Sequence, residues 1–282
     1  MPGRAAPWAM GVMAAMALVA LLIFVLFPLW TVAHSLTGSR LLPNGPWVGL
    51  AQYERLWTSE RWLISVGNLA IYAVGLLSGA LGIGAGLAVL LDRRIRAEGL
   101  FRAVLLYPYA LSFVVTGLAW QWMLNPTFGL PGLALLSDPD LAIHGVVMAG
   151  LWQGSGIVAV LILSGLRAID DDIWKAARLD GIAVWKTYLF IVFPMLRGVL
   201  ATATVLVLAS AIKLFDLVVA LTGGGPGLST EVPAKYVYDM MFENQNLGQG
   251  FAASTMMLTL VLVVMLCWAV AVWWMGRRRD HR

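Results

Sequence analysis

The sequence has little charge, little histidine and almost no cysteine. Of its 282 residues, 12% are charged and 60% are hydrophobic, whereas soluble domains carry roughly 25% charged residues. This composition leaves too little polar surface to cover a globule in water, so we expect a protein that lies in a bilayer. The basic residues flank apolar runs and form no groove-sized patch, so nucleic acid is not an expected partner.

Residues that could carry catalysis are also scarce. Cys267 is the single cysteine, so it cannot form an internal disulfide, and alone it makes no metal site. The three histidines, His34, His144 and His281, are far apart in the sequence. Without a nucleophile–base pair or a metal-ligand cluster, a membrane enzyme is the least favoured class. We expect this chain to bind no metal and no cofactor.

Long apolar runs dominate the sequence. A spanning helix needs about 20 mostly apolar residues, and each run must be helical because backbone polar groups in hydrocarbon need internal partners. The first run is too long for a secretory signal, whose apolar region has about 7–15 residues. We therefore expect an all-α membrane protein, a single transmembrane domain across 1–282, with about six spans at 9–33, 64–91, 102–124, 142–166, 190–221 and 252–275.

Lysine and arginine are unevenly distributed between the connections. The termini and the second and fourth connections hold thirteen, against four in the other connections. Cytoplasmic connections carry the excess of positive charge, so both termini are expected to be cytoplasmic. The thirteen are Arg4, Arg93, Arg94, Arg96, Arg102, Arg167, Lys175, Arg178, Lys186, Arg277, Arg278, Arg279 and Arg282, and the four are Arg40, Arg55, Arg61 and Lys235.

Two features outside the fourth connection predict local structure. Aromatic and leucine residues recur near helical spacing over 47–62, which predicts an amphipathic helix at the outer interface, and 233–245 is a candidate for a second one. In the second span, Gly75xxxGly79 and Gly82xxxGly86 form a small-residue stripe, which predicts close packing against a neighbouring helix.

The fourth connection, residues 167–194, has the pattern of two short helices joined by a turn. The three aspartates at 170–172 suit a helix N-terminus, where free amides and the helix dipole favour negative charge. Gly181 permits a turn that a residue with a side chain would resist. A second helix is expected over 184–192, before Pro194 marks the entry to the next span. One face of the first helix carries Ile173, Ala176, Ala177 and Asp180.

This segment resembles the EAA loop of ABC importer permeases, whose pattern is roughly E-A-A-x-x-x-G followed nine residues later by I-x-L-P. Lys175 stands where Glu is usual and Phe193 where Leu is usual, so no salt bridge of that Glu carries over. In that family the loop forms the coupling helix that inserts into the ATPase subunit. The resemblance therefore implies a coupling role for Lys175, Ala176, Ala177, Asp180, Gly181 and Pro194.

Other residues resemble the sugar-uptake branch of that family, which includes maltose-type permeases: Phe215-Asp216, 222–226, 230–233 and 47–50. The resemblance covers essentially the whole chain. It implies a type I importer fold in the bacterial plasma (inner) membrane, a second permease subunit in a heterodimer, and an extracytoplasmic solute-binding protein. It also implies two ATPase subunits that bind ATP and Mg, since this sequence has no P-loop. The implied substrate is a mono- or oligosaccharide.

Polar and ionisable residues inside the spans are the candidates for the substrate pathway. Lys213 and Asp216 are three residues apart in the fifth span, so they are expected to share a helix face, and either an ion pair or sugar binding would explain them. Sugars also need amides and flat aromatic faces. The remaining candidates are Asn68, Trp120, Gln121, Asn125, Trp152 and Gln153.

Three other interpretations remain open from the sequence. The importer could carry another solute, such as glycerol phosphate or a polyamine. An ion-coupled secondary transporter predicts intramembrane carboxylates and broken helices, and Asp216 is the one carboxylate placed well within a span. A membrane scaffold without transport activity would need no coupling loop.

Overall fold

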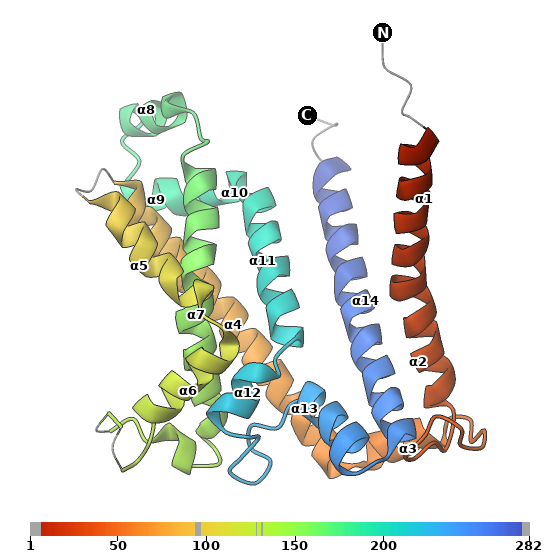
Figure 1. Cartoon of the computed structure of the whole chain (residues 1–282). Coiled ribbons are helices and arrows are strands. Elements are labelled where there is room, and N and C mark those ends of the chain that lie inside the picture. The colour runs from red at the N-terminus through yellow and green to blue at the C-terminus, as the bar shows by residue number, and fades with distance from the viewer. Residues whose placement is uncertain (1–6, 94–96, 128, 131, 278–282) are drawn as a thin grey trace. The chain divides into compact units, whose positions relative to one another are not determined.

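The computed structural model describes residues 7–93, 97–127, 129–130 and 132–277. These ranges are built from helices, and one isolated β-bridge joins Thr37 to Trp47 (Figure 1). The expected all-α fold is confirmed. The elements in chain order are α1 Pro7–Leu21, η1 Leu22–Leu26, α2 Phe27–Ser35, α3 Ala51–Thr58, α4 Glu60–Asp92, α5 Glu98–Ala110, α6 Phe113–Met123, η2 Leu135–Ser137, α7 Ala142–Leu166, α8 Asp171–Leu179, α9 Val184–Lys186, η3 Thr187–Val192, α10 Phe193–Met195, α11 Arg197–Ile212, α12 Asp216–Leu221, α13 Pro233–Tyr238, η4 Asp239–Glu243 and α14 Leu247–Arg277.

Four helical stretches in the described residues are long and apolar enough to cross a membrane: 11–35, 60–92, 142–166 and 247–270. Two further crossings exist if each of two bent helix pairs counts as one span. The six expected spans therefore all correspond to helices, but the third and the fifth are broken. Six of the charges used for orientation lie outside the described residues: Arg4, Arg94, Arg96, Arg278, Arg279 and Arg282. The orientation therefore stays a prediction. His281 also lies outside the described residues.

The third expected span, 102–124, is not one helix. α5 and α6 meet at an angle of 98°. Pro108 lies in the last turn of α5, and Ser112 caps α6 by accepting a hydrogen bond from the Val115 amide at 3.2 Å. Proline removes a backbone donor and serine favours a new N-terminus, so the chain ends one helix and starts another at this point.

The fifth expected span, 190–221, is also broken. α10 and α11 belong to a helix pair bent by 75°, with Pro194 in the first turn of α10, as the sequence indicated. α11 then ends at Ile212, and α12 begins at Asp216. The expectation that Lys213 and Asp216 share one helix face is therefore wrong, because a non-helical link separates them.

Two compact units make up the chain. The first contains Met1–Trp62 and Tyr236–Thr259, and the second contains Leu63–Lys235 and Leu260–Arg282. A single domain across 1–282 accordingly stays a prediction. Within the first unit, the Gly248 amide donates to the Ser39 carbonyl at 2.8 Å, and Arg61 forms an ion pair with Asp239. In α3, Leu56 is buried whereas Glu54 and Arg55 are exposed, so this part of the predicted segment is an amphipathic helix, and its place at the outer interface stays a prediction.

The second unit has its core between α4, α7, α11 and α12. Glycines permit the close contact of α4 with α7, because a β-carbon at Gly75 would lie 3.0 Å from the Val147 side chain, and one at Gly79 would meet Leu151. This confirms the Gly75xxxGly79 prediction. At Gly82 and Gly86 a β-carbon would meet no other element within 4 Å, so among the described residues the second half of the predicted stripe packs against nothing.

Candidate functional site

The expected loop is present as α8, a turn, α9 and η3, and it lies at one end of the second unit (Figure 1). Asp170 is the N-cap of α8, and its side chain accepts a hydrogen bond from the Asp172 amide at 3.0 Å. Lys175 Nζ lies 2.7 Å from Asp172 Oδ1, one turn earlier. The lysine that replaces the usual Glu thus has a local partner, and this exposed pair adds little to stability.

The turn after α8 is closed by Gly181, whose φ is +67°. The Gly181 amide donates to the Arg178 carbonyl at 3.2 Å, and the Ile182 amide donates to the Ala177 carbonyl at 3.0 Å. These two bonds form a Schellman motif, which requires a left-handed residue at the glycine position. The expected turn is confirmed, and glycine suits this position because the turn needs a left-handed backbone conformation.

The two alanines of α8 face different surroundings. Ala177 is buried and anchors α8 against the second unit, whereas Ala176 is exposed. Beyond them Leu179 is 88% exposed, and Trp185 on α9 is 61% exposed. The outer face of the loop therefore exposes large apolar side chains among charged ones, with Lys186 Nζ lying over the Trp185 ring, and such a surface suits a partner protein.

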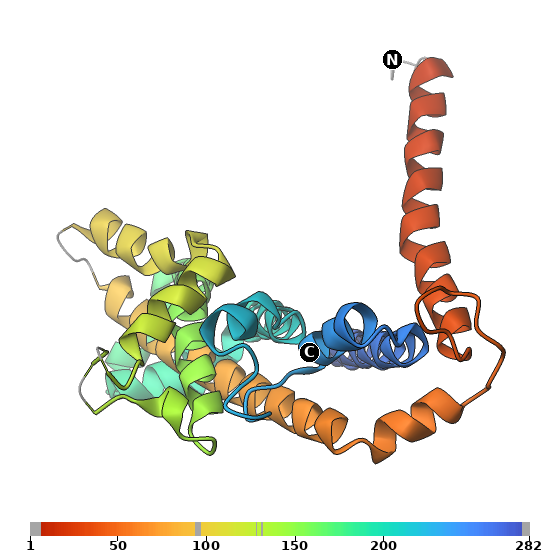
Figure 2. The ribbon, with the colours of Figure 1, turned by 60° about the horizontal axis from the view of Figure 1, so that its bottom comes forward.

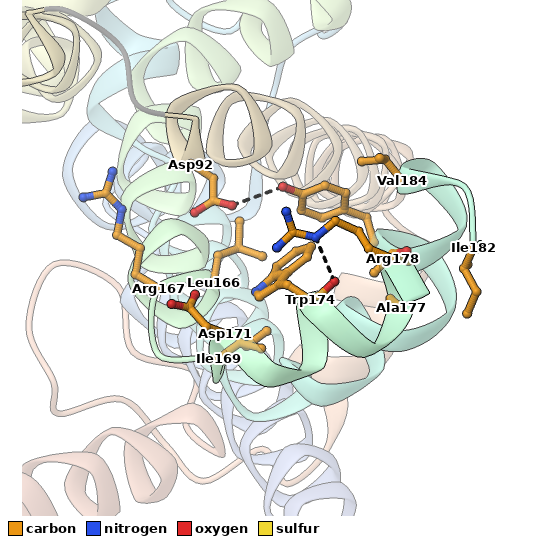
Figure 3. Close-up of a pocket in the computed structure, with 12 residues that line it drawn as sticks. Asp92, Leu166, Arg167, Ile169, Asp171, Trp174, Ala177, Arg178, Ile182 and Val184 are labelled. Atoms are coloured by element: carbon orange, nitrogen blue, oxygen red, sulfur yellow. Dashed lines mark hydrogen bonds between the residues drawn. The ribbon is translucent and has the colours of Figure 1, made fainter. Parts of the chain in front are cut away.

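A cavity of about 450 Å³ lies beneath α8 (Figure 3). The Tyr188 hydroxyl donates to Asp92 Oδ2 at 3.1 Å, and the Tyr188 ring packs edge-on against Trp174 of α8, with ring centroids 5.1 Å apart. Aromatic, acidic and basic side chains line the cavity, which is walled by the ends of α4 and α7 and by the loop; they are Asp92, Arg167, Asp171, Trp174, Arg178 and Tyr188.

Arg167 holds three helix ends together at the base of the loop. Its Nη2 atom lies 2.8 Å from Glu98 Oε1 at the start of α5 and donates to the Leu91 carbonyl at the end of α4 at 3.2 Å. Arg102 shares the same Glu98 oxygen at 2.7 Å. The hydrogen bond to the Glu98 carboxylate raises the pKa of Arg167, so the guanidinium keeps its charge.

The sequence did not single out Asp92, Glu98, Arg167 or Tyr188 as a site. Arg167 and Tyr188 are on the loop that the motif defined, but their partners Leu91 and Asp92 are 76 and 96 positions earlier in the chain. The one available signal was a carboxylate directly after the second apolar run.

At the opposite end of the second unit, α6 and α12 lie side by side (Figures 1 and 2). A cavity of about 340 Å³ lies here, lined by Gln121, Asn125, Thr222, Gly225 and Pro226 among others. The structure thus brings two predicted pathway residues, Gln121 and Asn125, next to the glycine-rich segment after α12.

Asn68 braces that segment from α4. Its Nδ2 atom donates to the Leu228 carbonyl at 3.1 Å and to the Glu231 carbonyl at 2.9 Å. Both amide hydrogens are used in this way and Asn68 is buried, so its role in the described chain is to hold the segment in place.

The two Trp-Gln pairs separate in the structure. Trp120 and Trp152 contact each other edge-on, with centroids 6.2 Å apart. Gln121 lies at the 340 Å³ cavity, whereas Gln153 is buried and donates to the Leu111 carbonyl at 2.9 Å, at the break between α5 and α6. Gln153 thereby satisfies a carbonyl that the broken helix exposes. No donor in the described residues reaches its Oε1 atom, which lies beside a 70 Å³ cavity.

Lys213 and Asp216 are exposed at the break between α11 and α12. In the described part of the chain no ion pair joins them. Lys213 is the C-cap of α11, and Asp216 is the first residue of α12, where a negative charge complements the helix dipole. These local roles account for both charges without a ligand.

The fold and the protruding loop together define a multi-pass transport subunit. Residues 78–277 match the family described as "Binding-protein-dependent transport system inner membrane component". The chain belongs to this family. It is therefore an inner membrane permease component of an ABC importer and not an enzyme.

Individual relatives cover most of the chain. A protein of Haloferax volcanii named xylose/arabinose import permease protein XacH is 33% identical over 79% of this chain and 74% of its own length. The sn-glycerol-3-phosphate transport system permease protein UgpA of Agrobacterium fabrum is 29% identical over 85% of this chain and 87% of its own length. A bacterial ABC transporter involved in alginate import has the same fold, with a TM-score of 0.79, 18% identity and 96% of each chain covered.

Proposed function

We propose that this permease imports a mono- or oligosaccharide and that the loop 167–194 couples it to separate ATPase subunits. The observation that carries the coupling role is the exposed outer face of the loop, on a helix whose end is fixed by the Schellman turn at Gly181. Its cluster of basic residues favours the cytoplasmic side. In this account Lys175, Ala176, Asp180 and Gly181 meet the ATPase, and Ala177 and Pro194 fix the loop to the spans.

The partners follow from the same proposal. A second permease subunit completes the pathway as a heterodimer, two ATPase subunits bind ATP and Mg, and an extracytoplasmic protein delivers the sugar. The alginate importer was also crystallised in complex with a periplasmic protein bound to an alginate pentasaccharide, and its permease chain has this fold. The delivered sugar would enter at the end of the second unit where Gln121 and Asn125 line a cavity.

The sugar assignment is supported by the relative named for xylose and arabinose and by the side-chain amides of Gln121 and Asn125 at the 340 Å³ cavity. The second candidate is glycerol phosphate, which the name of another relative favours. A phosphate would need cations facing the pathway, and Lys213 is the one cationic candidate proposed in the spans. Competition of sugar uptake by glycerol phosphate in reconstituted complexes separates the two candidates.

Site-directed cross-linking tests the coupling role. We expect Ala176→Cys, in a chain whose Cys267 is replaced by serine, to capture an ATPase subunit, because Ala176 is exposed on α8. Ala177→Cys is the matched control, since the neighbouring position is buried and should capture nothing. The measurement is the mass of the cross-linked product from membranes. Equal capture at both positions, or none at Ala176→Cys in an assembled complex, would rule out docking by this face.

A further inference from the structure

The two ends of the coupling loop converge on the last turn of α4. Arg167 enters from the end of α7 and donates to the Leu91 carbonyl at 3.2 Å. Tyr188 comes from the other end of the loop and donates to the Asp92 carboxylate at 3.1 Å (Figure 3). Two adjacent residues of α4 are thus held from both sides of the same loop.

The contact of Arg167 satisfies a need of α4 itself. The last four carbonyls of a helix have no partner within that helix, and a cation near the C-terminus complements the helix dipole. Arg167 supplies a hydrogen-bond donor to the Leu91 carbonyl and a positive charge at the end of α4. Its ion pair with Glu98 joins the start of α5 to the same group of contacts. Any displacement of Arg167 therefore acts on α4 and α5 together.

Tyr188 links the same group of contacts to α8. Its ring packs edge-on against Trp174 in the middle of α8, and its hydroxyl reaches Asp92. It is also the second residue of the π-helix η3, a wider helix form that occurs often at functional positions. The contacts Trp174–Tyr188–Asp92 thus form a continuous chain of side chains from α8 to α4.

We propose that Tyr188 and Arg167 are positioning residues that transmit the movement of α8 to the ends of α4 and α5. This inference rests on the proposed coupling role of the loop. In this assignment the movement of α8 reaches the spans through side-chain contacts as well as through the backbone on either side of α8. The Tyr188–Asp92 bond and the Arg167 contacts carry the displacement to two helices that are not adjacent to the loop in sequence.

The alternative is that these contacts only stabilise the fold. They are partly exposed, with the Arg167 and Glu98 side chains 41% and 26% exposed, and such pairs contribute little to stability. Single substitutions should therefore leave the complex assembled. The two roles are then separated by the ratio of substrate imported to ATP hydrolysed, which a purely structural contact would leave unchanged.

The test uses the full complex in proteoliposomes. Tyr188→Phe keeps the ring against Trp174 and removes only the hydroxyl. We expect it to lower the amount of sugar imported per ATP hydrolysed by roughly two- to thirtyfold, the usual range for a coupling residue, with unchanged assembly. Tyr107→Phe on α5, where the side chain is 64% exposed, is the matched control and should keep the wild-type ratio.

Variants at Asp92 identify the bond itself. Asp92→Asn keeps an oxygen acceptor for the Tyr188 hydroxyl and should retain coupling, whereas Asp92→Ala should lose it. The double variant with Tyr188→Phe and Asp92→Ala should be no worse than either single one, because both remove the same interaction. Arg167→Gln should likewise lower the ratio.

The outcomes are distinguishable from those of the proposed function. If Ala176→Cys captures the ATPase and Tyr188→Phe keeps the wild-type ratio, the transmission route is overturned and the docking role stands. Additive losses in the double variant would also overturn the route through the Tyr188–Asp92 bond. If Ala176→Cys captures nothing, the coupling role itself fails, and the route fails with it.

Discussion

A single backbone angle, at Gly181, sets how α8 ends within the loop 167–194, which we propose docks on the ATPase subunits. In the left-handed region a β-carbon approaches the following carbonyl oxygen, which costs roughly 1–2 kcal/mol for most residues and more for β-branched ones. No described atom lies within 4 Å of a β-carbon built at Gly181, so space is not the constraint. The requirement at this position is conformational alone.

This distinction gives a prediction for two substitutions at the same position. Gly181→Val should shift the end of α8 and uncouple ATP hydrolysis from uptake, while the chain still inserts into the membrane. Gly181→Asn should retain most coupling, because asparagine tolerates the left-handed conformation. The measurement is sugar uptake and phosphate release in the same vesicles. Equal behaviour of the two variants would mean that the backbone angle is not what matters.

Local chemistry made some of the site residues predictable from sequence. Asp170 and Gly181 act within a few positions of themselves, as a cap and a turn, and Pro194 lies just before the bend between Met195 and Arg197. The role of Gln153 was not predictable, because its partner is the Leu111 carbonyl at a helix break 42 positions earlier. Long-range pairings of this kind leave no periodic signal in one sequence.

At the scale of elements, the number of apolar runs was predictable and their continuity was not. Hydropathy reports whether a segment can lie in hydrocarbon, but a broken helix has the same composition as a straight one. The break after Ala110 is possible because another element supplies a partner there, the Gln153 side chain of α7. Broken helices also occur in secondary transporters, so the family match, and not the breaks, excludes that class here.

The packing of α7 against α5 gives a prediction for two glycines on one helix. A β-carbon at Gly156 would overlap the Leu105 carbonyl of α5, whereas one at Gly154 would meet nothing within 4 Å. We expect Gly156→Ala to destabilise the protein by roughly 1–3 kcal/mol, the usual cost of overpacking. Gly154→Ala should be neutral or slightly stabilising, since alanine favours helix. Thermal unfolding in detergent measures both, and similar melting temperatures would contradict this packing.

At the scale of the whole molecule, the two sites that we propose for transport lie at opposite ends of the second unit. The loop with α8 is at one end, and the cavity with Gln121 and the glycine-rich segment is at the other (Figure 1). The positive-inside prediction places the α8 end in the cytoplasm. An ATP-driven importer requires this separation, because the energy source and the delivered sugar arrive from opposite sides.

The most direct test of the account is vectorial uptake by the reconstituted complex. Vesicles would contain this chain with its partner permease and ATPases, and a radiolabelled sugar and the binding protein would be added outside. The account predicts uptake when ATP is enclosed inside the vesicles, on the α8 side of the importing molecules. It predicts no uptake when ATP is present only outside. Sugar accumulation driven by an ion gradient without ATP would contradict it.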